Sequence, residues 1–235
     1  MPAPEIVTAS WFGTVEYAAS WSWQRELYLA RLDGDTNDCL MLLEHPPTYT
    51  LGRRAIEKDL VYNENQRAAR GISLYNVDRG GRATYHGPGQ LVGYPILALG
   101  ERYDVLNYLR KLEEVVIRTA ADLGVEACRD EEHNTGVWVG NNKIGAIGVK
   151  ITRGITMHGF AFNVSTDLSM FEGIVPCGLQ DRWVTSVMNE TGRSHTVKEV
   201  GALAAKHLCD VFERSLVWTH PRALLSSDRT LVLQD

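Results

Sequence analysis

Apolar residues recur every three or four positions in three stretches of the chain, and this spacing predicts amphipathic helices. The first stretch covers residues 16–32. The second begins at Asp104, a residue type favoured at helix N-caps, and closes at Gly124, a residue type favoured just past helix ends. The third opens with a capping-box pattern at residues 196–199 and extends through Phe212.

Shorter apolar or alternating runs, bounded by glycine, proline or polar residues, predict strands. A Gly-Asn turn at residues 140–142 joins two of these runs into a hairpin. Pro95 interrupts another run, which indicates a bulge or a sheet edge, because proline has no backbone N–H to donate. Residues 59–70 predict a partial helix, whereas residues 218–235 carry no readable pattern. The predicted strands are residues 39–43, 48–51, 73–77, 91–97, 135–139, 143–151 and 156–164.

The order of these elements predicts a single domain. Strands form hairpin-like neighbours with helices between the groups, and no repeat, low-complexity segment or interdomain linker divides the chain. With 235 residues and 44% apolar composition, the chain can bury one large core. We therefore expect one α/β or α+β domain over residues 1–235, with a mixed, largely antiparallel sheet and flanking helices.

Composition excludes several classes of function. The net charge is −5 and no basic cluster is dense, so nucleic acid is not an expected partner. The longest uninterrupted apolar run, residues 40–43, is far shorter than a membrane span, and residues 1–5 lack the features of a signal peptide. A cytoplasmic protein with no membrane partner is therefore expected.

The four cysteines are widely spaced and form no Cys-x-x-Cys pair, so neither a zinc site nor a redox dithiol is predicted. Cys39 and Cys209 lie in apolar patterns and are expected in the core. Cys128 precedes three charged residues, which indicates an exposed edge. Cys177 lies between Pro176 and Gly178 in a predicted turn, a position that presents the thiol rather than packing it.

The glycine-rich stretch at residues 79–90 also carries two arginines and His86. Glycine lets a ligand or another backbone approach closely, so this loop is either shaped around a ligand or a simple connection between strands. It matches neither a Walker loop nor a dinucleotide-binding fingerprint. Another histidine, His45, precedes two prolines and is expected to have a structural role.

The reactive side chains available are the thiol of Cys177 and the amine of Lys143. A thiol attacks as its thiolate, and a nearby ammonium lowers its pKa, so this pair predicts nucleophilic chemistry if the two meet. Alternation along residues 143–151 places Lys143 on a face with small and apolar residues, but its position at the turn also suits a solvated lysine. A structural or merely exposed Cys177 is the corresponding alternative.

Several blocks of the chain, spread over about residues 40–190, resemble the octanoyl-acyl carrier protein:protein octanoyltransferases of lipoate biosynthesis, the LipB family. The glycine-rich stretch carries the strongest match, and the other blocks follow in the family's order and approximate spacing. The matching blocks are residues 43–52, 79–90, 136–138, 143–148, 157–161 and 175–178. Both termini, including the tail after about residue 217, lie outside them.

This resemblance implies the fold of biotin and lipoate protein ligases and a mechanism without cofactor or metal. Cys177 would attack the thioester of octanoyl-acyl carrier protein, and a lysine of a lipoyl domain would then take the acyl group as an amide. Lys143 matches the family's catalytic lysine. The implied acceptors are lipoyl domains of 2-oxoacid dehydrogenase E2 subunits and the glycine cleavage H protein, and a monomer is expected.

The resemblance also implies an acyl site in three stretches that are rich in glycine, which suits a narrow apolar slot. His86 is expected to position the loop or the thioester, and a direct role as a base stays open. The implied acyl-site residues are Arg79, Gly80, Gly81, Arg82, Ala83, Thr84, Tyr85 and His86, with Ala146, Ile147, Gly148, Gly159, Phe160 and Ala161.

Three other functions remain as alternatives: an ATP-dependent lipoate or biotin ligase, a non-catalytic acyl-binding protein, and a cysteine hydrolase. The first needs no cysteine nucleophile and the second forms no covalent intermediate. The implied protein partners are acidic, and a chain of net charge −5 would need a local basic patch to attract them. Candidates for this patch are Arg53, Arg54, Lys58, Arg79 and Arg82.

Overall fold

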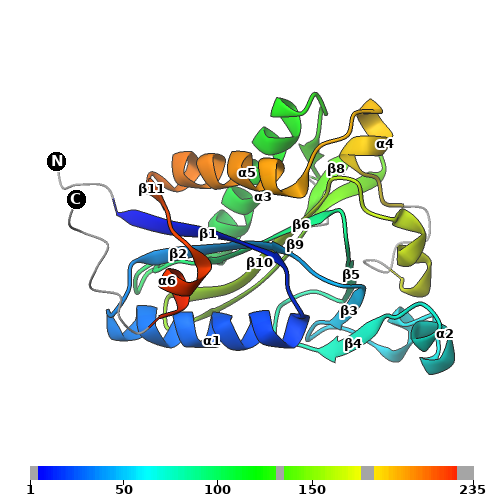
Figure 1. Cartoon of the computed structure of the whole chain (residues 1–235), viewed down its shortest axis with the longest axis horizontal. Coiled ribbons are helices and arrows are strands. Elements are labelled where there is room, and N and C mark those ends of the chain that lie inside the picture. Colours follow the sequence, from blue (N-terminus) through cyan, green and yellow to red (C-terminus); the bar gives the residue numbers. More distant parts are fainter. Residues whose placement is uncertain (1–4, 131–134, 176–182, 227–235) are drawn as a thin grey trace.

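The computed structural model describes residues 5–130, 135–175 and 183–226, and a mixed eight-stranded sheet crosses its centre (Figure 1). The strand order is β11-β1-β2-β6-β10-β9-β8-β7. β1 pairs in parallel with β2 and β11, and every other neighbouring pair in this order is antiparallel. The strands are β1 (Ile6–Thr14), β2 (Asp38–Glu44), β6 (Gln90–Ile96), β7 (Cys128–Arg129), β8 (Val137–Val139), β9 (Asn142–Thr152), β10 (Ile155–Asn163) and β11 (Ser215–Trp218).

A smaller sheet of order β4-β3-β5 lies beside one end of the main sheet (Figure 1). It contains β3 (Thr48–Leu51), β4 (Ser73–Asn76) and β5 (Ala83–His86). The short helices η1 (Glu57–Asp59) and α2 (Glu64–Ala68) connect its first two strands and confirm the partial helix predicted there. β5 was expected as loop, but half of its residues, Thr84 and Tyr85, favour extended backbone and pair with β3.

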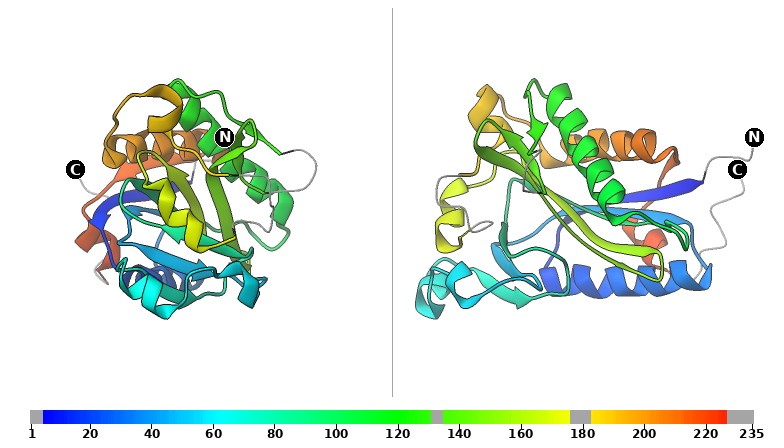
Figure 2. Two further views of the ribbon diagram at one scale, coloured as in Figure 1. Left: turned by 90° about the vertical axis from the view of Figure 1, so that its right-hand side faces the viewer. Right: turned by 180° about the vertical axis from the view of Figure 1, so that it is seen from behind.

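Helices cover both faces of the main sheet (Figure 2). α1 (Tyr17–Asp33) and α6 (Pro221–Leu225) lie on one face, while α3 (Val105–Asp122) and α5 (Val197–Phe212) lie together on the other. Two short helices, η2 (Leu168–Gly173) and α4 (Val187–Thr191), follow β10. The three predicted helices are confirmed, and so is the mixed sheet with flanking helices.

The predicted helix ends are confirmed by their hydrogen bonds. The carboxylate of Asp104 accepts the N–H of Leu106 at 2.9 Å and so caps α3. Thr196 and Glu199 form the reciprocal capping box of α5, each side chain accepting the other's backbone N–H. These caps satisfy N–H groups that have no partner within a helix.

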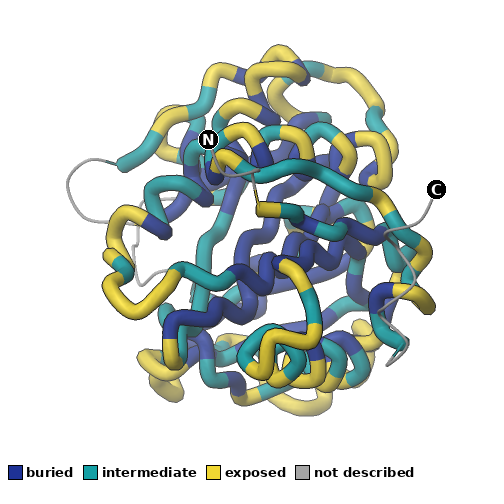
Figure 3. Tube along the Cα trace, turned by 90° about the vertical axis from the view of Figure 1, so that its left-hand side faces the viewer, coloured by how far each residue is buried: buried dark blue, intermediate teal, exposed yellow. Residues whose placement is uncertain are grey.

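Alternating residues of the central strands face two apolar cores, one on each side of the sheet. In β2, Leu40 and Leu42 pack in the core under α3 and α5, whereas Met41 and Leu43 pack in the core against α1. Figure 3 shows the buried central strands between more exposed helices. Cys39 and Cys209 are buried and Cys128 is exposed, as the sequence predicts.

The main departures from the predicted fold lie at the edges of the sheet. β1 and β11 were not predicted, because β1 pairs in parallel with β2 on one side and with β11 on the other, through residues distant in sequence. Pro95 lies in an internal strand, so the predicted sheet edge is wrong. The recorded β6–β10 ladder runs from Gln90 to Gly93 and stops short of Pro95, and His158 on β10 adopts a left-handed φ of 57° there.

None of the helices in the described residues has the length and apolar character needed to cross a membrane.

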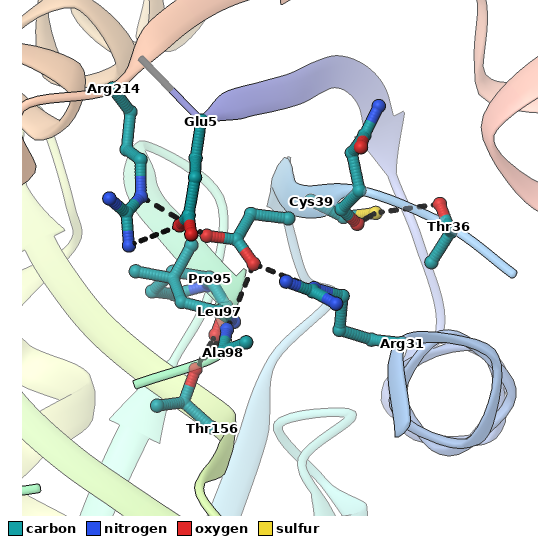
Figure 4. A network of polar contacts seen from close by, with 11 residues as sticks. Glu5, Arg31, Thr36, Cys39, Pro95, Leu97, Ala98, Thr156 and Arg214 are labelled. Carbon is teal, nitrogen blue, oxygen red and sulfur yellow. Dashed lines mark hydrogen bonds and ion pairs between the residues drawn. The ribbon is translucent and has the colours of Figure 1, made fainter. Parts of the chain in front are cut away.

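A buried carboxylate joins both ends of the chain to the centre of the sheet. Asp38, only 1% exposed, accepts hydrogen bonds from Arg31 at 2.8 Å, Arg214 at 3.3 Å and the Ala98 N–H at 2.9 Å. Arg214 also pairs with Glu5 at 2.6 Å. Figure 4 labels Glu5, Arg31, Ala98 and Arg214 of this network of polar contacts. Residues before β1 and after α5 are thereby tied to β2.

We expect Asp38→Ala to lower the free energy of unfolding by about 3 to 5 kcal/mol, because it leaves two guanidinium groups and an N–H without their shared acceptor. Urea unfolding measures the change. Asp122→Ala is the matched control: Asp122 pairs with His207 at 2.7 Å but is 43% exposed, so its removal should cost less than about 1 kcal/mol. Equal costs for the two variants would contradict the assigned role of Asp38.

Candidate functional site

A cavity of about 530 Å³ lies where the glycine-rich loop meets β9 and β10. It falls in the size range of small-molecule sites. The structure brings together nearly all of the described residues predicted for the site. The predicted residues that line the cavity are Arg79, Gly80, Gly81, Arg82, Ala83, Thr84, His86, Lys143, Ala146, Ile147, Gly148, Gly159, Phe160 and Ala161.

Tyr85 is the predicted site residue that is not among the cavity-lining residues. Its ring is 1% exposed and packs edge-on against Tyr49 at 5.9 Å and Phe171 at 5.3 Å between centroids. Alternation along β5 explains this placement, because neighbouring side chains of a strand point to opposite faces. Tyr85 therefore anchors the small sheet while its neighbours Thr84 and His86 reach the cavity.

Arg79 is buried within the loop and holds it in shape. Its guanidinium, with the whole residue 7% exposed, donates to the carbonyl and the hydroxyl of Thr50, both at 2.8 Å, and to the Gly80 carbonyl at 2.9 Å. A Cβ at Gly148 would lie 2.9 Å from its side chain. The absence of a side chain at Gly148 thus makes room for Arg79.

The loop is fastened to the main sheet by a carboxylate. Asp78 lies 2.7 Å from the amine of Lys150 on β9 and 2.7 Å from Nε2 of His158 on β10. Gly80 adds a backbone bond to the Val149 carbonyl at 2.9 Å. The hydrogen bond from His158, with that from Lys150, holds the pKa of Asp78 well below its usual value despite partial burial.

Burial has the larger effect on His158. It lowers the pKa of this imidazole below its ordinary value, although the nearby Asp78 acts in the opposite direction. An ion pair with Asp78 would by itself raise the pKa of His158, so the effects of Asp78 and of burial on this pKa are opposite. Since His158 is 1% exposed, desolvation dominates, and at neutral pH it is a neutral ring whose Nε2–H donates to Asp78.

Lys143 lies in the wall of the cavity, so the alternative of a solvated lysine is wrong. It is 8% exposed, and its amine lies 4.6 Å from the ring centroid of Trp138. Its backbone pairs with the segment after residue 182: its N–H donates to the Trp183 carbonyl and its carbonyl accepts the Thr185 N–H, both at 2.9 Å. A cation over an indole face is electrostatically favoured.

Two residues that sequence analysis did not single out as functional make room for Lys143. Gly136 has φ 137°, and a Cβ there would lie 3.1 Å from Cε of Lys143. Its N–H donates at 2.9 Å to Glu113, a fully buried carboxylate on α3 that also accepts from Arg110 at 2.8 Å. A charged residue on the apolar face of a predicted helix was the available signal for Glu113.

Cys177 and the rest of the turn predicted at residues 176–178 lie outside the described residues. The described chain on either side is tied to the site. The Val175 N–H donates to the Asp59 carbonyl at 2.9 Å, and the Trp183 carbonyl accepts the N–H of Lys143. The described residues that flank this segment are therefore held on one side to the connection of the small sheet and on the other to Lys143.

His86 lines the cavity and His45 packs edge-on against it, and both are neutral at neutral pH. His86 is 6% exposed, and burial, reinforced by the nearby His45, holds its pKa well below the ordinary value. Burial lowers the pKa of His45 to about 4. The predicted structural role of His45 is confirmed, because it lies 2.6 Å from the Val15 carbonyl and 2.8 Å from the Tyr94 hydroxyl.

The cavity wall also contains Tyr17, Gln90, Tyr94 and Asn163, which sequence analysis did not assign to a site. Their positions in a predicted helix or at strand ends gave no chemical signal. Within the described residues, His, Cys, Asp and Glu side chains form no group of three able to hold a metal ion. The chemistry available in the described wall therefore comes from one lysine amine, arginine guanidinium groups, neutral imidazoles and other hydrogen-bonding groups.

The expected basic patch is smaller than the sequence indicates. Arg79 is buried, and Arg82 donates through Nε at 2.9 Å to the fully buried carboxylate of Asp59. Arg53, Arg54 and Lys58 are exposed on the same connection of the small sheet. Of these three residues, Arg54 also lines the cavity.

Comparison with known proteins gives a consistent family. Residues 16–209 match the model of the lipoyl protein ligase A/B catalytic domain. An octanoyltransferase of Mycobacterium tuberculosis (strain H37Rv) is 48% identical over 200 residues, covering 84% of this chain and 83% of that protein. An octanoyltransferase of Koribacter versatilis (strain Ellin345) is 45% identical over 212 residues, covering 88% and 84%.

Solved structures share the fold at low sequence identity. A bi-partite lipoate protein ligase from Thermoplasma acidophilum has a TM-score of 0.71 at 17% identity, covering 97% of this chain and 91% of that chain. Biotin protein ligase from Aquifex aeolicus, in complex with biotin and ATP, has a TM-score of 0.54 at 15% identity, covering 88% and 70%. These likenesses confirm the predicted fold of biotin and lipoate ligases.

Proposed function

Because the chain belongs to the lipoyl protein ligase A/B catalytic-domain family and its relatives are octanoyltransferases, we propose that it transfers an octanoyl group to lipoyl domains through a thioester on Cys177. The donor is octanoyl-acyl carrier protein. The observation that carries the proposal is the burial of Lys143 in a cavity that it shares with the glycine-rich loop. This arrangement supplies a cation where a thiol must ionise.

In the first half-reaction, the thiolate of Cys177 attacks the carbonyl carbon of the donor thioester. A new C–S bond forms to the enzyme, the bond to the carrier-protein sulfur breaks, and the released thiolate takes up a proton. The ammonium of Lys143 stabilises the thiolate of Cys177 and lowers the pKa of its thiol. Its placement over Trp138 and beside Gly136 restricts the amine to the cavity wall.

In the second half-reaction, the ε-amine of a lysine on the lipoyl domain attacks the acyl-enzyme carbonyl. A C–N bond forms, the C–S bond to Cys177 breaks, and the proton lost by the nitrogen is accepted within the cavity or by the departing thiolate. The products are the octanoylated lipoyl domain and the free enzyme. No ATP is consumed, because the donor thioester is already activated.

The acyl chain occupies the cavity between the glycine-rich loop and β9 and β10. Ala146, Ile147 and Phe160 give it apolar contacts, while Gly148 and Gly159 keep the strands close to the loop and to β6. A pocket that combines an apolar wall with a few polar groups suits a medium-length acyl chain ending in a thioester.

Partners and setting follow from the same proposal. The acceptors are the lipoyl domains of 2-oxoacid dehydrogenase E2 subunits and the glycine cleavage H protein, and the protein acts as a cytoplasmic monomer without cofactor. An ATP-dependent ligase is the second candidate, since structures with the same fold include a biotin protein ligase in complex with biotin and ATP. Identity of 45–48% to octanoyltransferases, against 15–17% to those ligases, favours the transferase.

Intact mass after incubation with octanoyl-acyl carrier protein, without ATP, tests the proposed function. We expect one octanoyl adduct on the wild type, none on Cys177→Ala, and loss of the adduct when a lipoyl domain is added. Cys128→Ala, which removes an exposed thiol outside the cavity, is the matched control and should still be acylated. Product formed only with free octanoate and ATP would identify a ligase instead.

Lys143→Met should slow acyl-enzyme formation about 10- to 100-fold at neutral pH, because the thiol of Cys177 loses the cation that favours its thiolate. The rate should recover as the pH rises and the thiol ionises unaided. Rapid-quench acylation at several pH values measures this. The control is Lys111→Met, whose amine lies 5.2 Å from the Phe212 ring outside the cavity. A pH-independent loss would argue against the assigned role.

Charge reversal at Arg53 and Arg54 should raise KM for octanoyl-acyl carrier protein with little change in kcat, because both cations are exposed and Arg54 lines the cavity. The effect should shrink with added salt. Reversal of Lys198 and Lys206, two exposed lysines on α5, changes the net charge equally and is the control. An unchanged KM in the Arg53/Arg54 variant, or an equal rise in the control, would refute local docking.

A further inference from the structure

We infer that Gln90 and Asn163 are positioning residues that hold His86 in the Nδ1–H tautomer, so that its Nε2 accepts a proton inside the cavity during acyl transfer. The inference rests on the proposed function for the identity of that proton, which comes from the incoming amine. The tautomer itself is inferred from hydrogen bonds alone. Gln90 closes the glycine-rich stretch of residues 79–90, but neither it nor Asn163 is among the acyl-site residues that the sequence implies.

Gln90 and Asn163 lie opposite each other on two neighbouring strands of the main sheet. They are register partners at the junction of β6 and β10, with exposures of 1% and 5%. Oε1 of Gln90 lies 2.8 Å from Nδ1 of His86, and Nε2 of Gln90 lies 2.9 Å from Oδ1 of Asn163. Nδ2 of Asn163 lies 2.9 Å from the Thr185 carbonyl. The three side chains form one buried chain of hydrogen bonds.

The direction of every bond in this chain is set by its last member. The Thr185 carbonyl can only accept, so Asn163 donates to it through Nδ2 and must accept through Oδ1. Gln90 therefore donates through Nε2 and accepts through Oε1. A second carbonyl gives the same answer, because Nε2 of Gln90 also lies 3.1 Å from the Tyr85 carbonyl. The proton on His86 must then lie on Nδ1.

Nε2 of His86 is left as the acceptor. The ring lines the cavity, and its other nitrogen is engaged with Gln90. In a neutral imidazole with the proton on Nδ1, Nε2 carries a lone pair and accepts. The buried chain thus fixes which nitrogen is basic, as a second hydrogen bond to a histidine commonly does.

The surroundings of His86 keep it neutral. Tyr17 of α1 stacks on its ring at 6.0 Å between centroids, and His45, after β2, meets it edge-on at 5.6 Å. Arg79 of the loop and His158 of β10 also act on it electrostatically. Burial lowers its pKa well below the ordinary value, and His45, Arg79 and His158 act in the same direction, so Nε2 is unprotonated at neutral pH.

The chain also ties His86 to the backbone beside Lys143. The carbonyl of Thr185 closes the chain, and the N–H of the same residue donates to the Lys143 carbonyl at 2.9 Å. Thr185 follows the segment that carries Cys177. Thr185 therefore links the hydrogen-bonded chain of His86 to the backbone of Lys143.

The proton transfer balances as follows. When the lipoyl-domain amine adds to the acyl-enzyme carbonyl, its nitrogen becomes positively charged and must lose a proton before the amide is stable. Nε2 of His86 takes this proton and becomes imidazolium. The C–S bond to Cys177 breaks, and the departing thiolate takes the proton back from Nε2, which restores the neutral ring.

Long-range ¹H–¹⁵N correlation spectra of the histidine side chains test the tautomer in the wild-type protein. The signal of His86 is identified by its loss in His86→Gln, and the chain contains seven histidines. We expect a protonated Nδ1 and an unprotonated Nε2 at neutral pH. A protonated Nε2, or rapid exchange between the two tautomers, would overturn the inference whatever the reaction of the enzyme.

Gln90→Leu removes the acceptor for Nδ1–H. We expect the discharge of preformed acyl-enzyme by a lipoyl domain to slow about 10- to 100-fold, with acylation of Cys177 unchanged. Thr156→Val is the matched control: Thr156 bonds to the Leu97 N–H at 2.9 Å and the Pro95 carbonyl at 2.7 Å, a buried polar link between the same two strands at their other end. An equal slowing in both variants would overturn the inference.

Gln90→Glu keeps an oxygen for Nδ1–H and adds a carboxylate that favours the imidazolium form. We expect it to discharge the acyl-enzyme faster than Gln90→Leu at high pH, with the acidic limb of the pH–rate profile moved to higher pH. An acidic limb that stays in place would overturn the inference.

The two levels of the proposal fail separately. A wild type that is never octanoylated at Cys177 would refute the transferase mechanism, while the tautomer spectrum would still decide the hydrogen-bond chain. Normal acylation with equal discharge by the wild type and Gln90→Leu would refute the chain and leave the transferase intact.

Discussion

The site depends on one carboxylate that fastens a loop to a sheet. Asp78 accepts hydrogen bonds from Lys150 of β9 and from His158 of β10. These contacts hold the loop against the sheet, and the cavity lies between the two. His158 adopts a left-handed φ of 57°, a conformation unfavourable for a non-glycine residue, at the point where the ladder with β6 stops before Pro95. The irregular backbone of β10 thus places the imidazole of His158 beside Asp78 of the loop.

Much of the architecture could be predicted from local signals, but the site could be predicted only in part. Capping residues such as Asp104 located α3, because a cap acts on its own helix. The burial of Lys143 could not be predicted, since it depends on the close approach of Gly136, which precedes β8 and is held by a hydrogen bond to Glu113 of α3. The roles of Gln90 and Asn163 could not be predicted for the same reason, because the contact between them depends on the pairing of β6 with β10.

The fold and the chemistry are separate levels of information. Ligases at 15–17% identity share the arrangement of strands and helices, so the scaffold does not distinguish activation by ATP from transfer of an existing thioester. The distinction lies in side chains. Under the proposed function, the buried Lys143 and the neutral His86 would move protons between sulfur and nitrogen, and the low pKa of His86 would keep an acceptor available at neutral pH.

The pairing of β1 with β11 has a consequence for folding during synthesis on the ribosome. Ile6 pairs with Ser215, so one edge of β1 stays open until almost the whole chain has left the ribosome. The hairpin of β9 and β10 closes over a short connection and needs no such wait. During synthesis the unpaired edge is a template for other strands, so the nascent chain is most prone to aggregate before β11 emerges.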